Sequence, residues 1–460
     1  KYIKGELKPV EYSTDNFKGI TDKDEAIEFI QKAIQSSSEY IACDTETTGL
    51  FPRDGYILGI SLSYREDEGV YILTDIIDST VELLLQDLFT EKIVVFHNAK
   101  FDIAMLEYHF NFTFPRVEDT MLLHYLLNEN PGTHGLKQLA LRHTKYGNYE
   151  KPLTDYISNY CKKNRVLKSQ FSWEMIPFDI MQVYSAMDAV VTLIIFHKMK
   201  EAIAKNPKLE RVYDQILIPG MLFLKDIQDI GVPFDRKRLE LSQNLMEKEI
   251  EEAINSLYDF KEIKIFEKGQ GKEFNPNSTV QLRSLLFDYI GLKPTGKKTG
   301  TGAHSTDAEV LGALALKHDV PQLILNIRQK SKIKNTYLDK IIPQLDRDMR
   351  LRTNFNLHST TSGRLSSSGK LNMQQIPRDN PIIKGCIKAK EGNKIVAMDL
   401  TTAEVYVAAA LSDDKNLQQI FRTGGNFHSS IAKLVFKLPC KVEEVSEHYK
   451  LERQAAKAVT

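Results

Sequence analysis

The sequence predicts an α/β domain followed by a mainly helical region. Residues 21–205 alternate between short apolar runs typical of strands and longer amphipathic runs typical of helices. After Asn206-Pro207-Lys208 strand-like runs become scarce, and long helical patterns cover residues 211–230 and 239–257. We therefore expect a domain boundary near residue 205.

The spacing of apolar residues predicts the individual elements. Short continuous or alternating apolar runs indicate strands, and apolar residues three and four positions apart indicate helices. The expected strands are 40–43, 58–64, 70–73 and 93–96, and the expected helices are 25–34, 81–88 and 122–127. Three segments are expected to lack long elements: a connection with short helices at 147–172, a charged linker at 260–271 and a loop at 293–304.

Composition narrows the class of protein. The 460 residues suffice for roughly two to four domains of ordinary size. With 42% apolar and 27% charged residues, the chain has the composition of a globular protein. The longest apolar stretch, Val405 to Leu411, is far too short to span a membrane, and Lys1 to Asn16 lacks the apolar core of a signal peptide. We expect no membrane partner.

Charge and cysteine placement say less about the partner. The 61 basic and 61 acidic side chains cancel, so the net charge neither supports nor excludes a nucleic acid. The cysteines are widely separated, which argues against a zinc site or a disulfide framework and favours a cytoplasmic location. They are Cys43, Cys161, Cys386 and Cys440.

Several carboxylates follow apolar elements closely. Asp44 and Glu46 come directly after the expected strand 40–43, and the two-residue period of a strand places both on the same side. Asp102 follows the expected strand 93–96, near an expected helix start. A single Asp-x-Glu is usually part of a solvated loop, but this context favours a site.

Tyr184 and Asp188 complete the pattern. They are four residues apart after the apolar run 180–183, so a helix would place both on one face. Two divalent cations held by carboxylates can stabilise both the attacking and the leaving oxygen of a phosphodiester cleavage. Mg²⁺ and Mn²⁺ prefer such oxygen ligands.

This order of carboxylates, with a tyrosine before the last one, resembles the proofreading 3′→5′ exonucleases of the DEDDy type. The resemblance implies an RNase H-like α/β fold with a mixed sheet and flanking helices. It also implies removal of nucleotides from DNA 3′ ends with two Mg²⁺ or Mn²⁺ ions per active site. The implied catalytic residues are Asp44, Glu46, Asp102, Tyr184 and Asp188, of which the four carboxylates would also bind the metals.

Three residues beside these carboxylates are candidates to hold a single-stranded 3′ end. Leu50, Asn98 and Phe101 supply the apolar and polar groups that such a cleft uses. Packing in the core is the alternative role for Leu50 and Phe101.

Several segments beyond residue 205 resemble family A DNA polymerases, the DNA polymerase I class that includes replicative enzymes of tailed phages. Thr361 to Ser368 looks like the family's Thr-Gly-Arg-Leu-Ser-Ser segment, and Asn372 to Pro377 looks like Asn-Leu-Gln-Asn-Ile-Pro. The segments 274–278, 305–309 and 332–337 recur at positions expected of a polymerase thumb. The resemblance implies that Arg364 reaches the primer terminus and that Gln375 contacts substrate.

Residues 395–404 look like polymerase motif A. The resemblance implies a strand that runs into Asp399, which would present a carboxylate to the metal ions, with Leu400 as a further metal-binding position. Glu404 matches the residue that lies against the sugar and excludes a 2′-OH. The sequence departs from the family here, because Leu400, Thr402 and Tyr406 replace the usual Tyr, Gln and Arg.

Residues 452–457 look like the start of polymerase motif B. Arg453 and Lys457 would lie on one helix face and clamp a triphosphate, and His428 matches a further triphosphate contact. A solvated basic face is the alternative for Arg-x-x-x-Lys alone. The basic cluster at 328–334 has the same two readings, a solvated helix face or a contact to the DNA backbone.

The resemblance implies a domain order. The expected parts are the exonuclease domain at 1–205 with an N-terminal arm at 1–20, the thumb at 206–345, the first part of an α+β palm at 346–410 and the first part of the helical fingers at 411–460. Motif B would continue past Thr460, and motif C with its second catalytic Asp would lie downstream. We therefore expect an incomplete nucleotidyl-transfer site unless a C-terminal segment or partner chain completes it.

The leading prediction is the N-terminal part of a proofreading DNA polymerase that binds primer-template, a single-stranded 3′ end and dNTPs. The first alternative is a free-standing DEDDy-type exonuclease acting on DNA or RNA. The second is a non-catalytic DNA-binding subunit. The polymerase motifs argue against the first alternative, and the intact carboxylates argue against the second.

Overall fold

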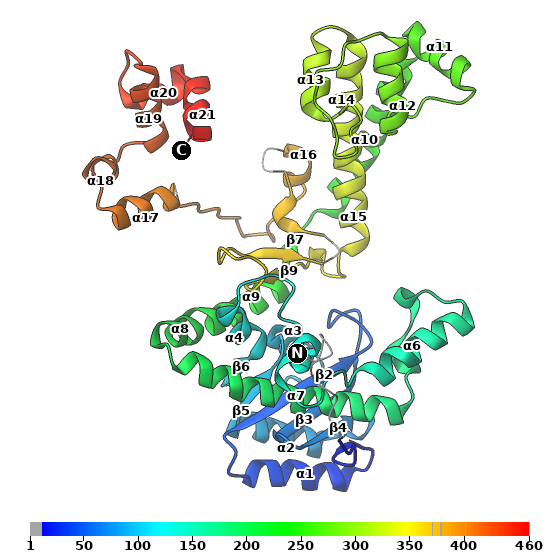
Figure 1. Cartoon of the computed structure of the whole chain (residues 1–460), viewed down its shortest axis with the longest axis vertical. Coiled ribbons are helices and arrows are strands. Elements are labelled where there is room, and N and C mark those ends of the chain that lie inside the picture. The colour runs from blue at the N-terminus through cyan, green and yellow to red at the C-terminus, as the bar shows by residue number, and fades with distance from the viewer. Residues whose placement is uncertain (1–11, 370, 378–379, 401, 460) are drawn as a thin grey trace. The chain divides into compact units, whose positions relative to one another are not determined.

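The computed structural model describes residues 12–369, 371–377, 380–400 and 402–459. It forms two compact units, Lys1–Lys388 and Ala389–Thr460, each with its own fold (Figure 1). The first unit contains the α/β domain and most of the helical region that the sequence predicts.

A six-stranded mixed sheet is the centre of the α/β domain. Its strand order is β1-β4-β3-β2-β5-β6. The central β2 pairs antiparallel with β3 and parallel with β5, so it is covered on both edges. The strands are β1 Phe17–Ile20, β2 Tyr40–Thr47, β3 Ile57–Arg65, β4 Glu68–Leu73, β5 Ile93–Phe96 and β6 Val117–Asp119. The four expected strands are confirmed, and β2 continues through the carboxylates instead of stopping before them.

Helices flank this sheet (Figure 1). α1 (Lys23–Gln35) and α2 (Ser79–Glu91) pack on each other, and their expected positions are confirmed. α3 (Ala99–Phe110) and α4 (Thr120–Leu127) follow β5 and β6, and the later helices are α5 (Leu136–His143) and α6 (Lys151–Asn164). α6 is a helix of 14 residues, longer than the short helices expected at 147–172.

The long helix α7 (Phe178–Ala204) packs against β1 to β4. It is long and apolar enough to cross a membrane by length and composition alone, but 72% of its most apolar window is buried inside the structure. That burial explains its apolar surface, because a helix covered on most sides by a sheet and other helices needs no polar face.

The two ends of the α/β domain differ in detail from the sequence prediction. Residues 17–20 of the expected N-terminal arm form the edge strand β1, because Phe17 and Ile20 are buried against the sheet. Tyr213 and Leu217 share the core of this domain although they lie beyond residue 205. The proposed domain boundaries remain predictions.

The helical pattern at 211–230 is divided near Pro219. α8 (Pro207–Val212) passes through a π-helical turn at Tyr213–Leu217 into α9 (Ile218–Ile230). Proline lacks the backbone N–H that would continue the α-helical ladder, so a local widening of the helix before Pro219 has a clear cause. α10 (Arg236–Leu257) is confirmed, and β7 (Val232–Pro233) separates it from α9.

The expected linker at 260–271 is wrong. This segment forms α11 (Lys261–Gln270), whose Ile263 and Phe266 are fully buried. They contact a separate apolar core together with α12 (Thr279–Ser284), α13 (Ala308–Ala315) and α14 (Asp319–Lys332). The three-residue spacing of Ile263 and Phe266 outweighs the charged residues between them.

The regular elements of the second unit, among its described residues, are all helices. It contains α17 (Ala403–Ser412), α18 (Lys415–Arg422), α19 (Phe427–Phe436), α20 (Val442–His448) and α21 (Lys450–Val459). The expected strand into Asp399 is wrong here: 393–400 is irregular, and Val396 and Met398 are 75% and 91% exposed. A strand forms only beside another strand that pairs with its backbone groups. The described part of this unit contains no such strand.

Candidate functional site

Strand β2 presents two carboxylates at its C-terminal end. Asp44 and Glu46 pair across from Ser61 and Gly59 of β3 and, being two residues apart, point to the same face of the sheet. Helix α7 packs against β2 and carries Asp188. The strand and the helix together therefore supply the acidic groups of the candidate site.

Three carboxylates converge at this point. One ligand oxygen each from Asp44, Glu46 and Asp188 lie within 4.8 Å of one another. Glu46 and Asp188 are buried, and the hydroxyl of Ser185 donates a hydrogen bond of 2.9 Å to Oε1 of Glu46. The three side chains therefore lie on the faces of the strand and the helix that the sequence spacing predicts.

Asp102 lies next to this group but outside it. It is buried on the first turn of α3, where its Oδ1 accepts hydrogen bonds from the backbone N–H (3.0 Å) and hydroxyl (2.7 Å) of Thr45. Thr45 separates Asp44 from Glu46 in the sequence, so Asp102 fixes the strand that carries them.

Burial and mutual repulsion make the charged cluster costly. Burial, followed by the charge of Asp188, raises the pKa of Asp44 well above its usual range and that of Glu46 to about 8. Burial also raises the pKa of Asp102 to about 7, against the hydrogen bonds from Thr45. A bound cation would relieve this cost, and buried carboxylate oxygens are the ligands that suit Mg²⁺ or Mn²⁺.

Tyr184 borders the same cluster. It is half-buried one turn before Asp188 on α7. Burial, followed by the negative charge of Asp188, raises the pKa of Tyr184 well above its usual value. The phenol therefore keeps its proton and remains a hydrogen-bond donor beside the carboxylates.

Lys137 and Tyr149 are functional candidates that the sequence analysis missed. The Lys137 ammonium forms an ion pair with Oδ1 of Asp188, and the Tyr149 hydroxyl donates a hydrogen bond to the same oxygen. Lys137 also lies over the Tyr184 ring, 4.3 Å from its centroid. Both residues lie at least 39 positions before Asp188, so no local pattern signals these contacts.

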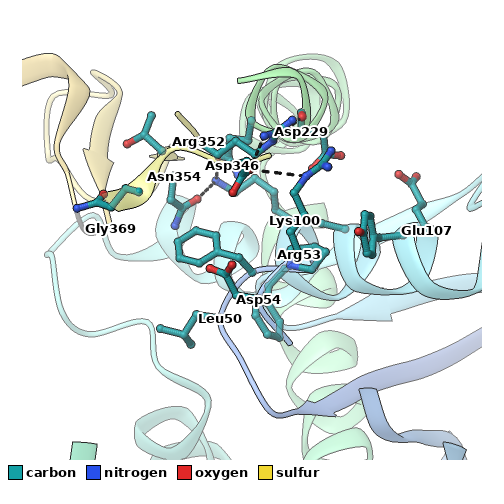
Figure 2. A pocket seen from close by; sticks show the side chains of 18 of the residues that line it. Leu50, Arg53, Asp54, Lys100, Glu107, Asp229, Asp346, Arg352, Asn354 and Gly369 are labelled. Atoms are coloured by element: carbon teal, nitrogen blue, oxygen red, sulfur yellow. Dashed lines mark hydrogen bonds and ion pairs between the residues drawn. The ribbon is translucent and has the colours of Figure 1, made fainter. Parts of the chain in front are cut away.

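A pocket of about 770 Å³ is lined by all three candidate substrate residues, Leu50, Asn98 and Phe101, and by none of the four carboxylates (Figure 2). Leu50 is 78% exposed, so its alternative core-packing role is wrong. Phe101 lines the pocket with one part of its ring and packs against the domain core with another.

The pocket joins α3 to segments far along the chain. Lys100, which is buried, donates hydrogen bonds to the side-chain oxygens of Gln228 (2.6 Å) and Asn354 (2.5 Å). Figure 2 shows Lys100 pointing toward Asn354. Burial lowers the pKa of Lys100 to about 8. Residues beyond 340 thus form one wall of a pocket whose other wall belongs to the α/β domain.

The candidate polymerase residues fall in both units. Arg364 and Gln375 are exposed in the first unit, and the Gln375 backbone oxygen accepts a 2.8 Å hydrogen bond from Tyr337. In the second unit Asp399 and Leu400 are exposed in the irregular segment, and Glu404 lies in the first turn of α17.

The three proposed triphosphate contacts do lie together in the second unit. Arg453 of α21 donates a hydrogen bond of 3.2 Å to Ser429 of α19. Burial and then the positive charges of Lys457 and Arg453 lower the pKa of His428. Arg453 and Lys457 are on one helix, as the sequence predicts.

Comparisons with known proteins agree with these two parts. The family model described as 3'-5' exonuclease matches residues 17–204, and the one described as DNA polymerase family A matches residues 242–460. The DNA polymerase of Escherichia phage T5 is 45% identical over 97% of this chain and 54% of its own length. DNA polymerase I of Pseudomonas aeruginosa is 29% identical over 92% of this chain and 46% of its own length. The chain spans about half the length of these relatives.

A solved structure has the same fold. The POL domain of Pol1 from M. smegmatis, in complex with DNA primer-template and dNTP, matches 96% of this chain and 70% of its own chain with a TM-score of 0.74 and 23% sequence identity. The predicted fold class, a mixed sheet with flanking helices followed by a helical region, is therefore confirmed. The chain belongs to the family A DNA polymerases and carries their 3′→5′ exonuclease domain.

Proposed function

We propose that this chain removes nucleotides from single-stranded DNA 3′ ends and so proofreads DNA synthesis. The convergence of Asp44, Glu46 and Asp188 carries this proposal, because three carboxylates with ligand oxygens within 4.8 Å of one another, two of them buried, form a cluster that a divalent cation would stabilise. The proposed cofactor is Mg²⁺ or Mn²⁺, two ions per site, with Asp102 as the fourth carboxylate. The proposed location is the cytoplasm of a bacterial or phage-infected cell.

The side chains of the site have separate roles in this proposal. Bound metal ions would lower the pKa of a water molecule and stabilise the charge on the phosphate. The carboxylates hold those ions, and the Thr45–Asp102 hydrogen bonds keep β2 and α3 in register. The Tyr184 hydroxyl, protonated and beside Asp188, orients the attacking water.

The pocket lined by Leu50, Asn98 and Phe101 is the proposed binding site for the unpaired end. It offers Leu50 and Phe101 as apolar surfaces for bases and Asn98 as a polar contact. A duplex end would have to separate before its last nucleotides could enter, so single strands should be trimmed faster than blunt duplexes.

We expect Leu50→Ala to raise KM for a single-stranded oligonucleotide by roughly three- to tenfold with little change in kcat, since one apolar contact is worth about 1 kcal/mol. Leu50 is 78% exposed, so the substitution should not destabilise the fold. The matched control is Leu83→Ala, which removes a 69% exposed leucine from α2. Steady-state trimming of a 3′-labelled strand gives both constants, and equal trimming of blunt duplex and single strand would contradict this role.

We propose further that the candidate polymerase residues, which lie between Arg364 and Lys457, serve DNA synthesis. Asp399 would bind the metals with Leu400 beside it, Glu404 would select the deoxy sugar, and Arg364 and Gln375 would contact the primer-template. The grouping of His428, Arg453 and Lys457 supports a triphosphate site. The proposed site also needs the family's motif C carboxylate. The proposal therefore concerns a protein that supplies it, either in the same polypeptide or through a C-terminal partner.

Asp399→Ala should then abolish templated primer extension by such a protein and leave 3′ trimming unchanged, because the two reactions use separate carboxylates. Extension by the variant at the normal rate would show that Asp399 is not a catalytic ligand. The matched control is Asp413→Ala, which changes an exposed carboxylate of the same unit. The match to DNA polymerase family A over 242–460 favours this function over a free-standing exonuclease.

A further inference from the structure

Lys137 places a fixed positive charge inside a cluster that is built to hold metal ions. It begins the first turn of α5, and its ammonium forms an ion pair with Asp188, whose side chain is only 5% exposed. Among the residues that the structure describes, no other Lys or Arg forms an ion pair with Asp44, Glu46, Asp102 or Asp188. The charge is therefore specific to this site.

Aromatic rings hold this ammonium in place. It lies 4.3 Å from the centroid of Tyr184 and 4.8 Å from that of Tyr149, and it donates a hydrogen bond of 3.0 Å to the Tyr149 hydroxyl. A cation over two aromatic faces is held more firmly than one in water. Lys137 remains 25% exposed, so its long side chain can still move away toward solvent.

The charge of Lys137 affects both the metal-free site and the binding of a divalent ion. Without a cation, three or four carboxylates would face one another in a buried site. One lysine offsets part of that negative charge. A divalent ion that approaches the same Asp188 oxygen meets both the repulsion of the ammonium and a ligand atom that is already occupied.

From this geometry we infer that Lys137 is an internal counter-cation that competes with divalent ions for Asp188. It stabilises the metal-free site and sets the metal concentration at which the site fills. Lys137 is thus a positioning residue, since it acts through Asp188. The inference rests on the proposed metal-dependent trimming.

The test is Mn²⁺ binding to the full chain, measured by isothermal titration calorimetry in one near-neutral buffer for all variants. Lys137→Gln keeps a hydrogen-bond donor but removes the charge, and it should bind Mn²⁺ on the order of tenfold more tightly than the wild type. Lys137→Arg, which keeps the charge, should stay close to the wild-type affinity. The metal-free Lys137→Gln protein should melt at a lower temperature than the wild type.

Two further variants separate charge from orientation. Tyr149→Phe removes the second donor to Asp188 without changing the charge, so it should not tighten Mn²⁺ binding. Lys145→Gln is the matched control, because Lys145 also lies over a tyrosine, 5.2 Å from the centroid of Tyr146, but forms no ion pair with the cluster. Its Mn²⁺ affinity should equal that of the wild type.

Equal or weaker Mn²⁺ binding by Lys137→Gln would overturn the inference, because a competitor that is removed must leave a stronger site. Failure of the proposed function gives a different result. In that case the wild type would show no Mn²⁺ binding that Asp44→Ala with Glu46→Ala removes, and the inference would fall together with the metal site on which it rests.

Discussion

Replacing Asp44 and Glu46 together with alanine is expected to lower the rate of 3′ trimming on the order of a thousandfold or more, about 4 kcal/mol of transition-state stabilisation. The double variant keeps only Asp188 of the three converging carboxylates, which cannot hold two cations. DNA binding should persist, because the pocket lined by Leu50 and Phe101 is left intact. Stability should not fall in the metal-free protein, because two buried, mutually repelling carboxylates have been removed.

The matched control must also replace two carboxylates with alanine, but at positions far from the candidate site. Asp24→Ala with Glu25→Ala changes two exposed residues in the first turn of α1 and should trim normally. Tyr184→Phe should give an intermediate loss, because the carboxylates still bind metal but the attacking water loses its hydrogen bond. Trimming of a labelled single strand gives the rates, and fluorescence anisotropy gives the DNA affinity. Normal trimming by the Asp44/Glu46 double variant would place the active site elsewhere.

The acidic part of the site is predictable from the sequence because it follows from short periods. Two residues on one strand face the same way, so Asp44 and Glu46 are paired before any tertiary structure is known. Residues four positions apart on one helix share a face, which pairs Tyr184 with Asp188. The apolar runs that bury this strand and this helix are visible in the sequence. They predict the two elements on which the carboxylates lie.

Tertiary contacts were not predictable in this way. Lys137 and Tyr149 reach Asp188 from other segments, and no spacing rule links them to it. The buried wall that Asn354 adds to the pocket comes from 254 residues beyond Lys100. The wrong prediction of a linker at α11 has a different cause. The spacing of Ile263 and Phe266 indicated a helix, but the charged residues around them favoured a linker.

The irregular segment before Asp399 shows why a local strand preference is not sufficient to form a strand. Its residues 395–398 form a continuous apolar run that favours a strand, yet a strand forms only where another strand satisfies its backbone groups. The described residues of the second unit offer no such partner. Local preference therefore predicts a strand correctly only when its neighbours are also present.

A cluster of histidines gives the exonuclease domain a contribution to stability that acid removes. His124 of α4 and His134 of the next loop are 5% and 3% exposed, and their Nδ1 atoms are 2.8 Å apart. One Nδ1 must donate and the other accept, so the pair cannot be doubly protonated without losing this bond. The ring of His358 packs edge-on against His134 with the centroids 5.9 Å apart.

Burial keeps these histidines neutral in the folded state. It lowers the pKa of His124 to about 4 and that of His358 to about 4, with the charges of neighbouring histidines adding to the effect. In the unfolded chain each histidine titrates near about 6.5. The stabilisation is therefore complete above roughly pH 6.5 and is lost as the pH falls toward about 4, where the unfolded chain binds protons that the folded chain does not.

Each neutral histidine contributes about 1.4 kcal/mol per pH unit to the free energy of unfolding below about pH 6.5, while Glu46 and Asp102, whose pKa is raised in the folded state, contribute with the opposite sign. We therefore expect a difference between two proteins: between about pH 7.5 and pH 5 the wild type should lose roughly 2 kcal/mol of unfolding free energy relative to His124→Gln. Trp173 is the single tryptophan of the chain and lies beside Tyr184, so its fluorescence in urea reports unfolding of this domain alone. His124→Gln should remove one such histidine contribution from the pH dependence, and His448→Gln, at an exposed histidine, is the matched control. An equal slope for wild type and His124→Gln would mean that His124 is protonated in the folded protein. The hydrogen-bonded pair would then have to be rearranged, since two protonated Nδ1 atoms at 2.8 Å would repel each other.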